Sequence, residues 1–497
     1  MHSTQPRLLF AFAPTRDTHD RFFNCYPSSL LHAIAPLVHS VDNGQIDISY
    51  CDRIYHPKVF TEEAALLWRA MLDRERPTHL AISSTYDSWH VALLLGRVAR
   101  EILPNVIIIQ GGPHLDEVLE PFVLRRTPEL HPLDGDAGSA VDFAVGGDGE
   151  YILRWLVEAT IGAENAAEAT ARVHSRRDET SRLPGAANLV YVFDGDRRAV
   201  RFRNPLPLDD LPFVPRHLLP VEDLYDFDCF RDAGGHRKPT VTMITHRGCR
   251  ARCNFCSEGL PYQSRSHSHI LAEAQELASS GVRAVFLDDS TVQDDPAFAE
   301  LLKGFHGLGL EVGALTRFDQ VQDLKELARM RDFGLVYLYA SIEQYSNHSL
   351  DLMHKKLRTE QIDSGIRNCN DSGIRLGVSL LFGLPYETPQ SVEATLDYAT
   401  RLREQELVEY VSMSMYSYHP RTPLGQMRRE LLAGFDFNHE PPNLRHPYTS
   451  FEEGSWYHPD HVTDEYADSI WLRAKSGFGD RLVRQLAKHR GSVPEDR

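Results

Sequence analysis

The stretch THRGCRARCNFCSEG, residues 245–259, places three of the chain's seven cysteines within eight positions, in the spacing C-x3-C-x2-C. Thiolates are soft ligands, so such a cluster indicates a zinc or iron–sulfur site. A structural zinc site is normally closed by four ligands, and the nearby candidate for a fourth is His246. An iron–sulfur cubane needs no fourth protein ligand if one iron binds a small molecule. We therefore favour an iron–sulfur centre held by Cys249, Cys253 and Cys256, with zinc or a purely structural thiol cluster as the alternative.

The segments around this stretch predict the fold that carries it. From residue 239 onward, apolar strand patterns alternate with amphipathic helices, for example at 321–332 and 388–404. The six predicted strands are PTVTMITH (239–246), RAVFLDDS (283–290), EVGALTRFD (311–319), LVYLYASIE (335–343), RLGVSLLFG (375–383) and EYVSMSMYSYHP (409–420). Six βα units are fewer than the eight of a closed barrel. The pattern predicts a partial (β/α)6 barrel over 239–425, with the cysteines at the catalytic end of its first strand.

The first part of the chain predicts a second α/β domain, over residues 1–160. Five strand patterns alternate with helices, which favours a doubly wound, flavodoxin-like parallel sheet. The strands are RLLFAFAP (7–14), IDISYCD (46–52), THLAISSTY (78–86), NVIIIQGGPH (105–114) and VDFAVGGDGE (141–150). Two of them run into glycine-rich turns, at 110–114 and 146–150. Ligands bind at the carboxyl ends of strands in such sheets, so these turns are candidate ligand contacts; the alternative is that they are only tight turns.

Two further segments complete the predicted organisation. Residues 161–238 have the composition of a connector, with a β-hairpin turned by Asp194 and Gly195. Residues 426–497 form a small C-terminal extension with one amphipathic helix, and this extension is a candidate active-site lid.

The overall composition is that of an ordinary soluble protein. Of 497 residues, 42% are hydrophobic, and 53 basic against 70 acidic residues give a formal net charge of −17. This charge argues against general affinity for nucleic acid or anionic lipid. There is neither an apolar run long enough to span a membrane nor a signal-peptide pattern, so a cytoplasmic location is expected. Seven cysteines without a secretion signal are not a disulfide framework. Cys25, Cys51, Cys229 and Cys369 are isolated and are expected to be small buried or inert thiols; the alternative is that the fold brings Cys25, Cys51 and Cys229 together at an auxiliary cluster.

The cysteine triplet and the strands after it resemble the radical S-adenosylmethionine (SAM) superfamily. Phe255 stands before the third cysteine, as an aromatic residue commonly does there. The further matching segments are FLDDS (286–290), TRFD (316–319), ASIEQYSNHSLDLMHK (340–355), which resembles GIES…L..M.K, and GVSLLFGLPYETPQS (377–391), which resembles G-x-x-x-x-F-G-x-P-x-E-T. The resemblance covers roughly 240–425.

The resemblance implies a 4Fe-4S cluster held by Cys249, Cys253 and Cys256, with SAM on the open iron. Reductive cleavage of SAM would give a 5′-deoxyadenosyl radical, with the electron coming from an external donor of the flavodoxin or ferredoxin type. Carried over by position, the residues near SAM are Phe255, Asp289, Arg317, Ser341, Glu343, Phe382 and Gly383. For the two charged ones there is a structural alternative, in which Glu343 is a strand-end carboxylate paired with Arg317.

The N-terminal domain in turn resembles the cobalamin-binding domain of one branch of the superfamily. That branch has a strand ending in GGPH, as here at 111–114, and a turn like VDFAVGGDGE, in which Asp148 replaces the usual first glutamate. The resemblance implies corrin contacts from Ser83, Ser84 or Thr85, Gly111, Gly112, Pro113, Gly147, Gly149 and Glu150. There is no D-x-H-x-x-G, so no histidine is predicted to bind cobalt. The alternative is that the fold persists without cobalamin.

Several residues remain as candidates for substrate chemistry. Tyrosine can donate a proton or hydrogen atom, and histidine can act as acid or base. The catalytic candidates are Tyr386, Tyr416 and His114, and Tyr418, Trp456, Tyr457 and His458 are further candidates. Our leading hypothesis is a cobalamin-dependent radical SAM methyltransferase acting on a small molecule in specialised metabolism, using one SAM to methylate cobalamin and one to form the radical. The alternatives are a radical enzyme without cobalamin, catalysing dehydration, epimerisation, rearrangement or heteroatom exchange, and a non-catalytic metal-binding module.

Overall fold

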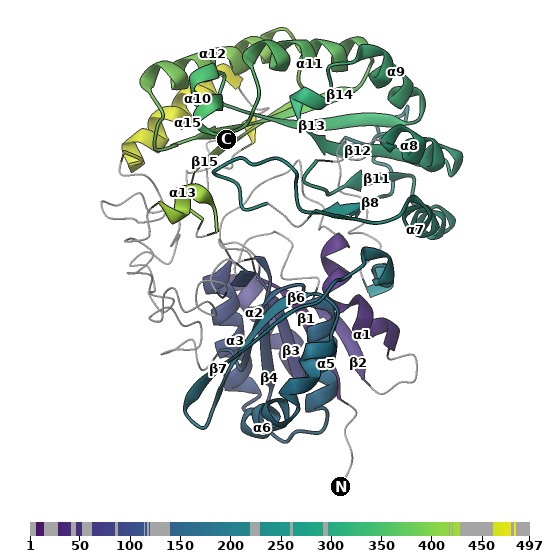
Figure 1. The fold of residues 1–497 in the computed structure, drawn as a ribbon, viewed down its shortest axis with the longest axis vertical. Helices are drawn as coiled ribbons and strands as arrows, with labels where there is room; N and C mark the ends of the chain where they lie inside the picture. The colour runs from purple at the N-terminus through teal and green to yellow at the C-terminus, as the bar shows by residue number, and fades with distance from the viewer. Residues whose placement is uncertain are drawn as a thin grey trace.

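The computed structural model forms two α/β parts that lie one above the other (Figure 1). The structure describes residues 6–13, 28–40, 46–51, 62–84, 88–113, 115–116, 119, 140–218, 229–258, 262–291, 297–416, 418–419, 421–427, 461–478 and 482–483.

The first part is built on a seven-stranded sheet with the order β2-β1-β3-β4-β5-β6-β7. The first five strands pair in parallel in the flavodoxin-like order 2-1-3-4-5. The prediction of a doubly wound, flavodoxin-like sheet is therefore confirmed. The parallel strands are β1 (Arg7–Phe12), β2 (Asp47–Cys51), β3 (His79–Ser83), β4 (Ile107–Gly111) and β5 (Phe143–Gly147).

Both faces of this sheet are buried, because apolar residues follow one another along each strand and point alternately to the two faces. Leu9 and Ala11 pack in one cluster with helix residues such as Trp68, while Leu8 and Phe10 pack in the opposite cluster. The first face is covered by α2 (Glu62–Glu75) and α3 (Trp89–Ile102). The second face is covered by η1 (Ser28–Ile34), α1 (Ala35–Ser40), α5 (Glu150–Thr160) and α6 (Ala166–Arg176).

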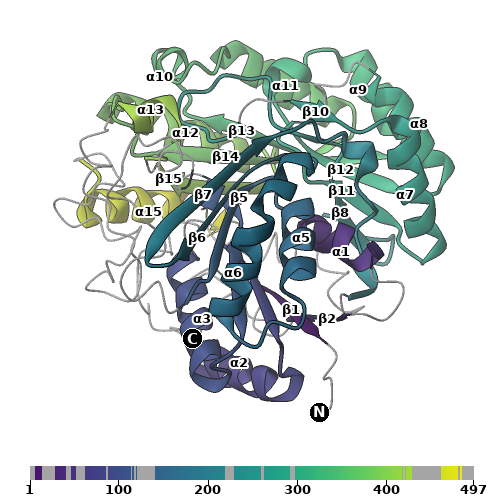
Figure 2. The ribbon, with the colours of Figure 1, turned by 60° about the horizontal axis from the view of Figure 1, so that its bottom comes forward.

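The segment predicted as a connector is more ordered than its composition indicates. The predicted hairpin is present as β6 (Ala186–Phe193) and β7 (Asp196–Arg203), and Asp194 and Gly195 both have positive φ, as a type I′ turn requires. It lies along the first sheet because β6 pairs antiparallel with β5 (Figure 2). The polar stretch before it contains α6, whose N-cap Asn165 accepts from the Glu168 amide. Three short 3₁₀ helices lie in the same region, at Arg177–Arg182, Leu208–Asp210 and Arg216–Leu218.

The second part is a half-barrel around a parallel sheet with the order β16-β15-β14-β13-β12-β11-β8. All six predicted strands are present and adjacent in chain order, which confirms the partial barrel. They are β8 (Thr240–Met243), β11 (Ala284–Leu287), β12 (Glu311–Thr316), β13 (Leu335–Glu343), β14 (Arg375–Phe382) and β15 (Tyr410–Met415). A seventh, two-residue strand, β16 (Leu482–Val483), comes from the C-terminal extension and pairs with β15.

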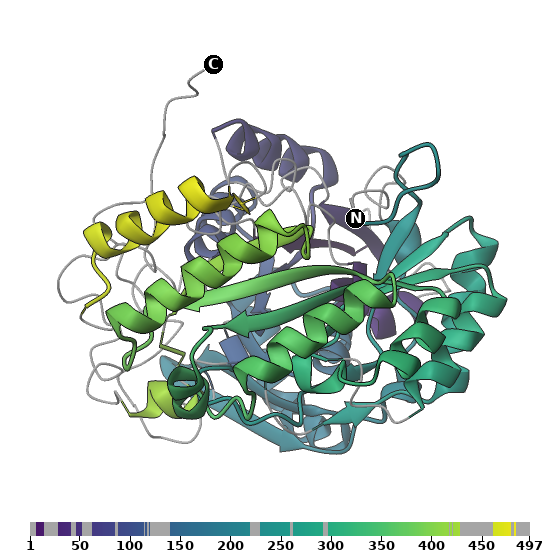
Figure 3. The ribbon, with the colours of Figure 1, turned by 90° about the horizontal axis from the view of Figure 1, so that it is seen from above.

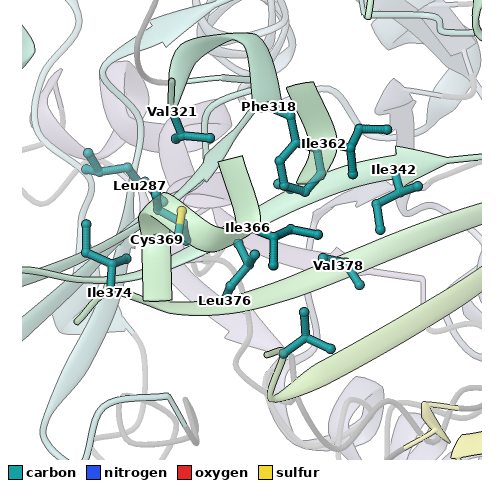
Figure 4. Close-up of a cluster of buried hydrophobic side chains, with 14 of the residues drawn as sticks. Leu287, Phe318, Val321, Ile342, Ile362, Ile366, Cys369, Ile374, Leu376 and Val378 are labelled. Carbon is teal, nitrogen blue, oxygen red and sulfur yellow. The ribbon is translucent and has the colours of Figure 1, made fainter. Parts of the chain in front are cut away.

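Helices cover the outer face of the half-barrel (Figure 3). The core between strands and helices contains Ile342, Ile366 and Val378, and Cys369 lies in it with no solvent exposure (Figure 4). The helix α15 (Asp464–Phe478) of the C-terminal extension lies beside α12 (Pro389–Glu404). The other helices are α7 (His267–Ser279), α8 (Phe298–Gly307), α9 (Leu324–Asp332), α10 (Asn347–Leu352), α11 (Thr359–Asp371) and α13 (Pro423–Gln426), with the 3₁₀ helix η9 (Phe318–Gln320).

Candidate cofactor site

The three clustered cysteines lie in a loop that begins at a short ladder. The strand β9 (His246–Arg247) pairs antiparallel with β10 (Gln263–Ser264), after the carboxyl end of β8. We call residues 248–258, which follow β9, the cluster loop. Asn254 anchors it, since its amide donates to Met353 O at 3.0 Å and its side-chain nitrogen to Leu352 O at 2.6 Å.

A buried aspartate holds the start of the cluster loop. Asp289 follows β11; its Oδ1 accepts from the Thr245 amide at 2.7 Å and from the His246 amide at 3.1 Å, and its Oδ2 accepts from Thr245 Oγ1 at 2.5 Å. Burial raises the pKa of Asp289, while His246 and the hydrogen bonds from Thr245 oppose that shift. Asp289 therefore positions the loop, and a contact between Asp289 and a cofactor remains a prediction.

The cysteine side chains fit an iron–sulfur cluster by their chemistry. Cys249 is buried, Cys253 and Cys256 are half-buried, and burial raises the pKa of the Cys256 thiol to about 12. The Cys256 thiolate is therefore favoured by nearby positive charge, which iron would supply. Among the described residues, no three His, Cys, Asp or Glu side chains are already gathered as a metal site. His246 is turned toward Asp289, with 3.6 Å between its Nδ1 and the Asp289 Oδ2.

A chain of charged groups leads from the cluster loop across the barrel. Arg317, directly after β12, donates to Cys253 Sγ at 3.8 Å and to the Lys355 carbonyl oxygen at 2.6 Å. Lys355 Nζ forms a buried ion pair with Glu343 Oε1 at 2.8 Å. The alternative pairing of Arg317 with Glu343 is wrong: Arg317 pairs instead with Asp319, at 3.1 Å between its Nε and Oδ1. Lys355 was missed as a site residue, although it is the last residue of the matching segment 340–355.

The backbone at Glu343 is unusual. Glu343 has φ of +62° at the end of β13, where the register with β14 shifts. A non-glycine residue in this region costs about 1–3 kcal/mol and persists only where its surroundings hold it. The surroundings here include the ion pair to Lys355, so the strand end directs a buried carboxylate towards the carboxyl edge of the barrel.

Other predicted residues gather at the same edge. Ser341 accepts from Ser379 Oγ at 2.8 Å, and Phe382 is fully buried at the end of β14. The Tyr386 hydroxyl is buried and has no hydrogen-bond partner among the described residues. Burial, and then the negative charges of Cys253 and Glu343, raise the pKa of Tyr386. Phe255 packs against the barrel core, while the buried Tyr416 follows β15 and its ring lies edge-on to Tyr418.

The C-terminal extension reaches this edge through a half-buried carboxyl group. Glu387 accepts from the Gly383 amide at 3.0 Å, from Gln344 Nε2 and from the Tyr466 hydroxyl of α15. Val462 lies directly over Gly383. The extension is thus packed against the turn after β14, and its role as an active-site lid stays a prediction.

This carboxyl group predicts a pH dependence of stability. Burial raises the pKa of Glu387 to about 8, against an opposing effect of the Gly383 and Gln344 hydrogen bonds. The folded state binds the proton more tightly, so the contribution is fully present below about pH 4.3 and is lost as pH rises through about 8. In urea unfolding between pH 6 and 9, the wild-type free energy of unfolding should fall relative to Glu387→Gln. The exposed control Glu404→Gln should follow the wild type; equal slopes for wild type and Glu387→Gln would contradict the prediction.

The second set of predicted residues lies at the carboxyl edge of the first sheet. Ser83, Gly111 and Gly147 end the adjacent strands β3, β4 and β5. The Ser84 amide donates to Gly111 O at 3.0 Å, Pro113 is exposed beside this contact, and Gly149 caps α5 at its N-terminus. Gly112 has φ of +102°, and a Cβ there would lie 2.4 Å from the Ser84 carbonyl oxygen. Glu150 is buried, and its Oε2 has no hydrogen-bond partner among the described residues.

Some predicted residues lie outside the described residues. They are His114, Thr85, Trp456, Tyr457, His458 and Cys25. For Cys51 the strand is described but the side chain is not. Of the other isolated cysteines, Cys229 is buried near the opposite end of the barrel, beside Phe230 and Tyr337.

Comparison with known proteins finds relatives of the barrel and of the whole chain. Residues 243–399 match the radical SAM superfamily model. An uncharacterized methyltransferase of Pyrococcus horikoshii is 24% identical over 464 residues, which cover 90% of this chain and 88% of that protein. The anaerobic magnesium-protoporphyrin IX monomethyl ester cyclase of Cereibacter sphaeroides is 26% identical over 373 residues, and the match spans 73% of this chain but only 55% of the cyclase.

Solved structures share the whole two-part fold. The structure of the radical SAM methyltransferase TsrM from Kitasatospora setae, with cobalamin and a 4Fe-4S cluster bound, has a TM-score of 0.62 at 16% identity and covers 97% of this chain and 93% of TsrM. The cobalamin-dependent SAM radical enzyme OxsB, with aqua-cobalamin and SAM bound, has a TM-score of 0.60 at 14% identity, covering 96% of this chain and 68% of OxsB. No helix among the described residues has the length and apolar composition of a membrane span.

Proposed function

We propose that this chain is a cobalamin-dependent radical SAM methyltransferase acting on a small molecule. The match of residues 243–399 to the radical SAM superfamily model supports the radical SAM part of this proposal. The observation that carries this proposal is that the chain has two candidate ligand sites, each at the carboxyl edge of a sheet, and that these two edges are in contact. The glycine turns of a flavodoxin-like sheet lie at one, and the cluster loop of a half-barrel lies at the other. Arg247 joins them through Asp148 and Glu150.

The chain's own residues fit the proposed groups. Cys249, Cys253 and Cys256 would hold the cluster, and Glu343, Arg317 and Ser341 would bind the polar parts of SAM. When bound, the cluster would supply the electron that cleaves SAM, and cobalamin would supply methyl-transfer chemistry. Glu150 Oε2, a buried acceptor without a partner among the described residues, suits a corrin amide, because a buried oxygen left unbonded costs about 1–3 kcal/mol.

Proteins of similar structure support the parts of this proposal to different degrees. TsrM and OxsB are both described with cobalamin, whereas a methyltransferase activity is stated for TsrM. The TsrM structure with tryptophan as substrate supports a small-molecule substrate. In this chain, Tyr386 is our candidate for a substrate or SAM contact, because its buried hydroxyl faces the edge where Cys253 and Glu343 lie. An external electron donor of the flavodoxin or ferredoxin type is part of the proposal.

Anaerobic reconstitution tests the proposal. We expect about four iron and four sulfide per chain, hydroxocobalamin bound one to one, and both 5′-deoxyadenosine and S-adenosylhomocysteine on incubation with SAM and a reductant. Formation of 5′-deoxyadenosine without bound cobalamin would overturn the cobalamin part and favour a cobalamin-independent radical enzyme. Absence of both products would favour a non-catalytic metal-binding module.

The glycine turn after β4 gives a separate prediction for cobalamin binding. Gly112→Ala should weaken hydroxocobalamin binding about tenfold or more, because its Cβ would overlap the Ser84 backbone and move the turn. The matched control is Gly162→Ala: its φ is +72°, and a Cβ there meets nothing within 4 Å. Both variants bear the cost of positive φ, about 1–2 kcal/mol. Equilibrium dialysis should therefore separate them; equal affinities would exclude this turn from the cobalamin site.

A further inference from the structure

Arg247, directly before the cluster loop, contacts the first part of the molecule. It lies two positions before Cys249, in β9. Its guanidinium pairs with Asp148 Oδ1, at 3.3 Å from Nη1, and with Glu150 Oε1 through Nη2. Both carboxylates belong to the turn 146–150 after β5. A planar guanidinium can hold two carboxylates at fixed positions, which a lysine ammonium does less well.

The acidic end of this contact is fixed within the first sheet. The Asp148 amide donates to Ala186 O at 2.9 Å, and the Ala186 amide donates to Asp148 Oδ2 at 2.8 Å. Gly147 has φ of +94°, and a Cβ there would lie 2.2 Å from Ala186 O. The hairpin strand β6 therefore holds the turn from one side, while Glu150 begins α5.

The basic end is fixed within the half-barrel. Arg247 pairs with Gln263 across the β9–β10 ladder. The preceding residues Thr245 and His246 donate their amides to the buried Asp289. The Arg265 amide donates to Thr245 O at 2.9 Å. Because both ends are held rigidly, the contact between them sets the distance between the turn and the loop.

Other buried charged groups lie near this contact, so removal of Arg247 should lower stability. Nearby, Glu273 lies between Arg216, at 2.5 Å, and Arg265, at 2.7 Å. His32 of the first part is buried beside these charges, and burial, the largest cause, lowers its pKa to about 3. His32 is thus neutral at ordinary pH, and three guanidinium groups face three carboxylates. Removing one buried partner leaves another charge uncompensated.

We propose that Arg247 is a positioning residue that fixes the cluster loop against the turn 146–150. This positioning role has a consequence that rests on the proposed function: the Arg247 guanidinium sets the distance between SAM at the cluster loop and cobalamin at the turn. Methyl transfer from SAM to cobalamin requires both sites in register. Cleavage of SAM to 5′-deoxyadenosine requires only the SAM site of the half-barrel, which the turn 146–150 does not form.

The test compares Arg247→Met, Arg247→Lys and the wild-type holoenzyme, loaded with hydroxocobalamin, SAM and a chemical reductant. In Arg247→Met, 5′-deoxyadenosine formation should stay within about twofold, while the rate of S-adenosylhomocysteine formation falls about tenfold to hundredfold, as misplacement of reacting groups by about 1 Å predicts. Arg247→Lys should lie between. Iron content should not change, because Arg247 is not a cluster ligand.

Hydrogen exchange provides a readout that does not depend on activity. In Arg247→Met without added substrate, amides of 144–151 and 245–249 should exchange faster, while the barrel strands β13 and β14 keep their protection. The control is Arg154→Met, which removes the same charge from α5, where Arg154 pairs with Glu158 on the surface at 2.8 Å. It should match the wild type in both assays.

The two possible failures are distinguishable. If the wild type binds no cobalamin, the proposed function fails, and hydrogen exchange still tests the positioning role. If both product rates fall by one common factor, or if exchange at 144–151 is unchanged in Arg247→Met, the positioning role is overturned while the proposed function stands.

Discussion

Cys253→Ala should reduce the iron content of the anaerobically reconstituted protein from about four to less than about one per chain and abolish 5′-deoxyadenosine formation. Three thiolates are the ligands proposed here, and a cluster held by two is labile. Cys253 is also the cysteine whose sulfur Arg317 contacts, at 3.8 Å. Its loss therefore disconnects the cluster loop from the charged chain that leads to Glu343. Iron analysis, the absorbance near 400 nm of iron–sulfur proteins and product analysis by mass spectrometry measure the effect.

The matched control is Cys369→Ala. Cys369 is fully buried in the barrel core, on α11 (Figure 4). Its replacement removes one sulfur from a packed interior, which should lower the free energy of unfolding by about 1 kcal/mol and leave iron content and 5′-deoxyadenosine unchanged. Full iron content in Cys253→Ala, or equal loss in both variants, would contradict the assignment of the cluster ligands.

Lys355→Met should lower the free energy of unfolding by about 3–5 kcal/mol, because it leaves the Glu343 carboxylate buried without its cation. The two side chains are only 4% and 11% exposed, and their Nζ–Oε1 distance is 2.8 Å. In the double variant Glu343→Gln/Lys355→Met no unpaired charge remains, so the loss should be smaller than the sum of the single losses, with a coupling of about 2–3 kcal/mol. Urea unfolding of the four proteins completes this cycle.

A more exposed ion pair of the same kind is the control for this cycle. Lys238 and Glu311 lie 2.7 Å apart, but their side chains are 23% and 34% exposed. Water compensates the charge that is left when Lys238→Met removes the cation, so that loss should be about 1 kcal/mol or less. If Lys355→Met and Lys238→Met lower the free energy of unfolding equally, burial does not determine how much the Glu343–Lys355 pair contributes to stability.

The parallel sheets were the most predictable part of the molecule. Each strand of the half-barrel is a short stretch rich in apolar residues between turns, and that pattern depends on local sequence alone. The first sheet was equally readable, and its order 2-1-3-4-5 followed from the expected class. The cluster loop was found because three cysteines stand close together in sequence.

Features that depend on long-range contacts could not be predicted in the same way. The connector was interpreted as polar and irregular, yet α6 buries a narrow stripe of Ala169 and Val173 against the sheet. The hairpin sequence does not specify that β6 pairs with β5. Likewise, sequence reasoning offered Arg317 as the partner of Glu343, because nothing local indicates that Lys355, twelve residues later, reaches the carboxylate first.

The order of the barrel strands also has a consequence for synthesis on the ribosome. Strand β15 ends at Met415, but its outer neighbour β16 is Leu482–Val483. At about 5–20 residues per second, several seconds pass between completion of β15 and synthesis of its partner. During that interval the nascent chain presents an unpaired parallel edge, which is a template for association with other chains. Completion of the barrel is therefore a late event of translation, and a ribosomal pause before residue 482 would prolong the exposure.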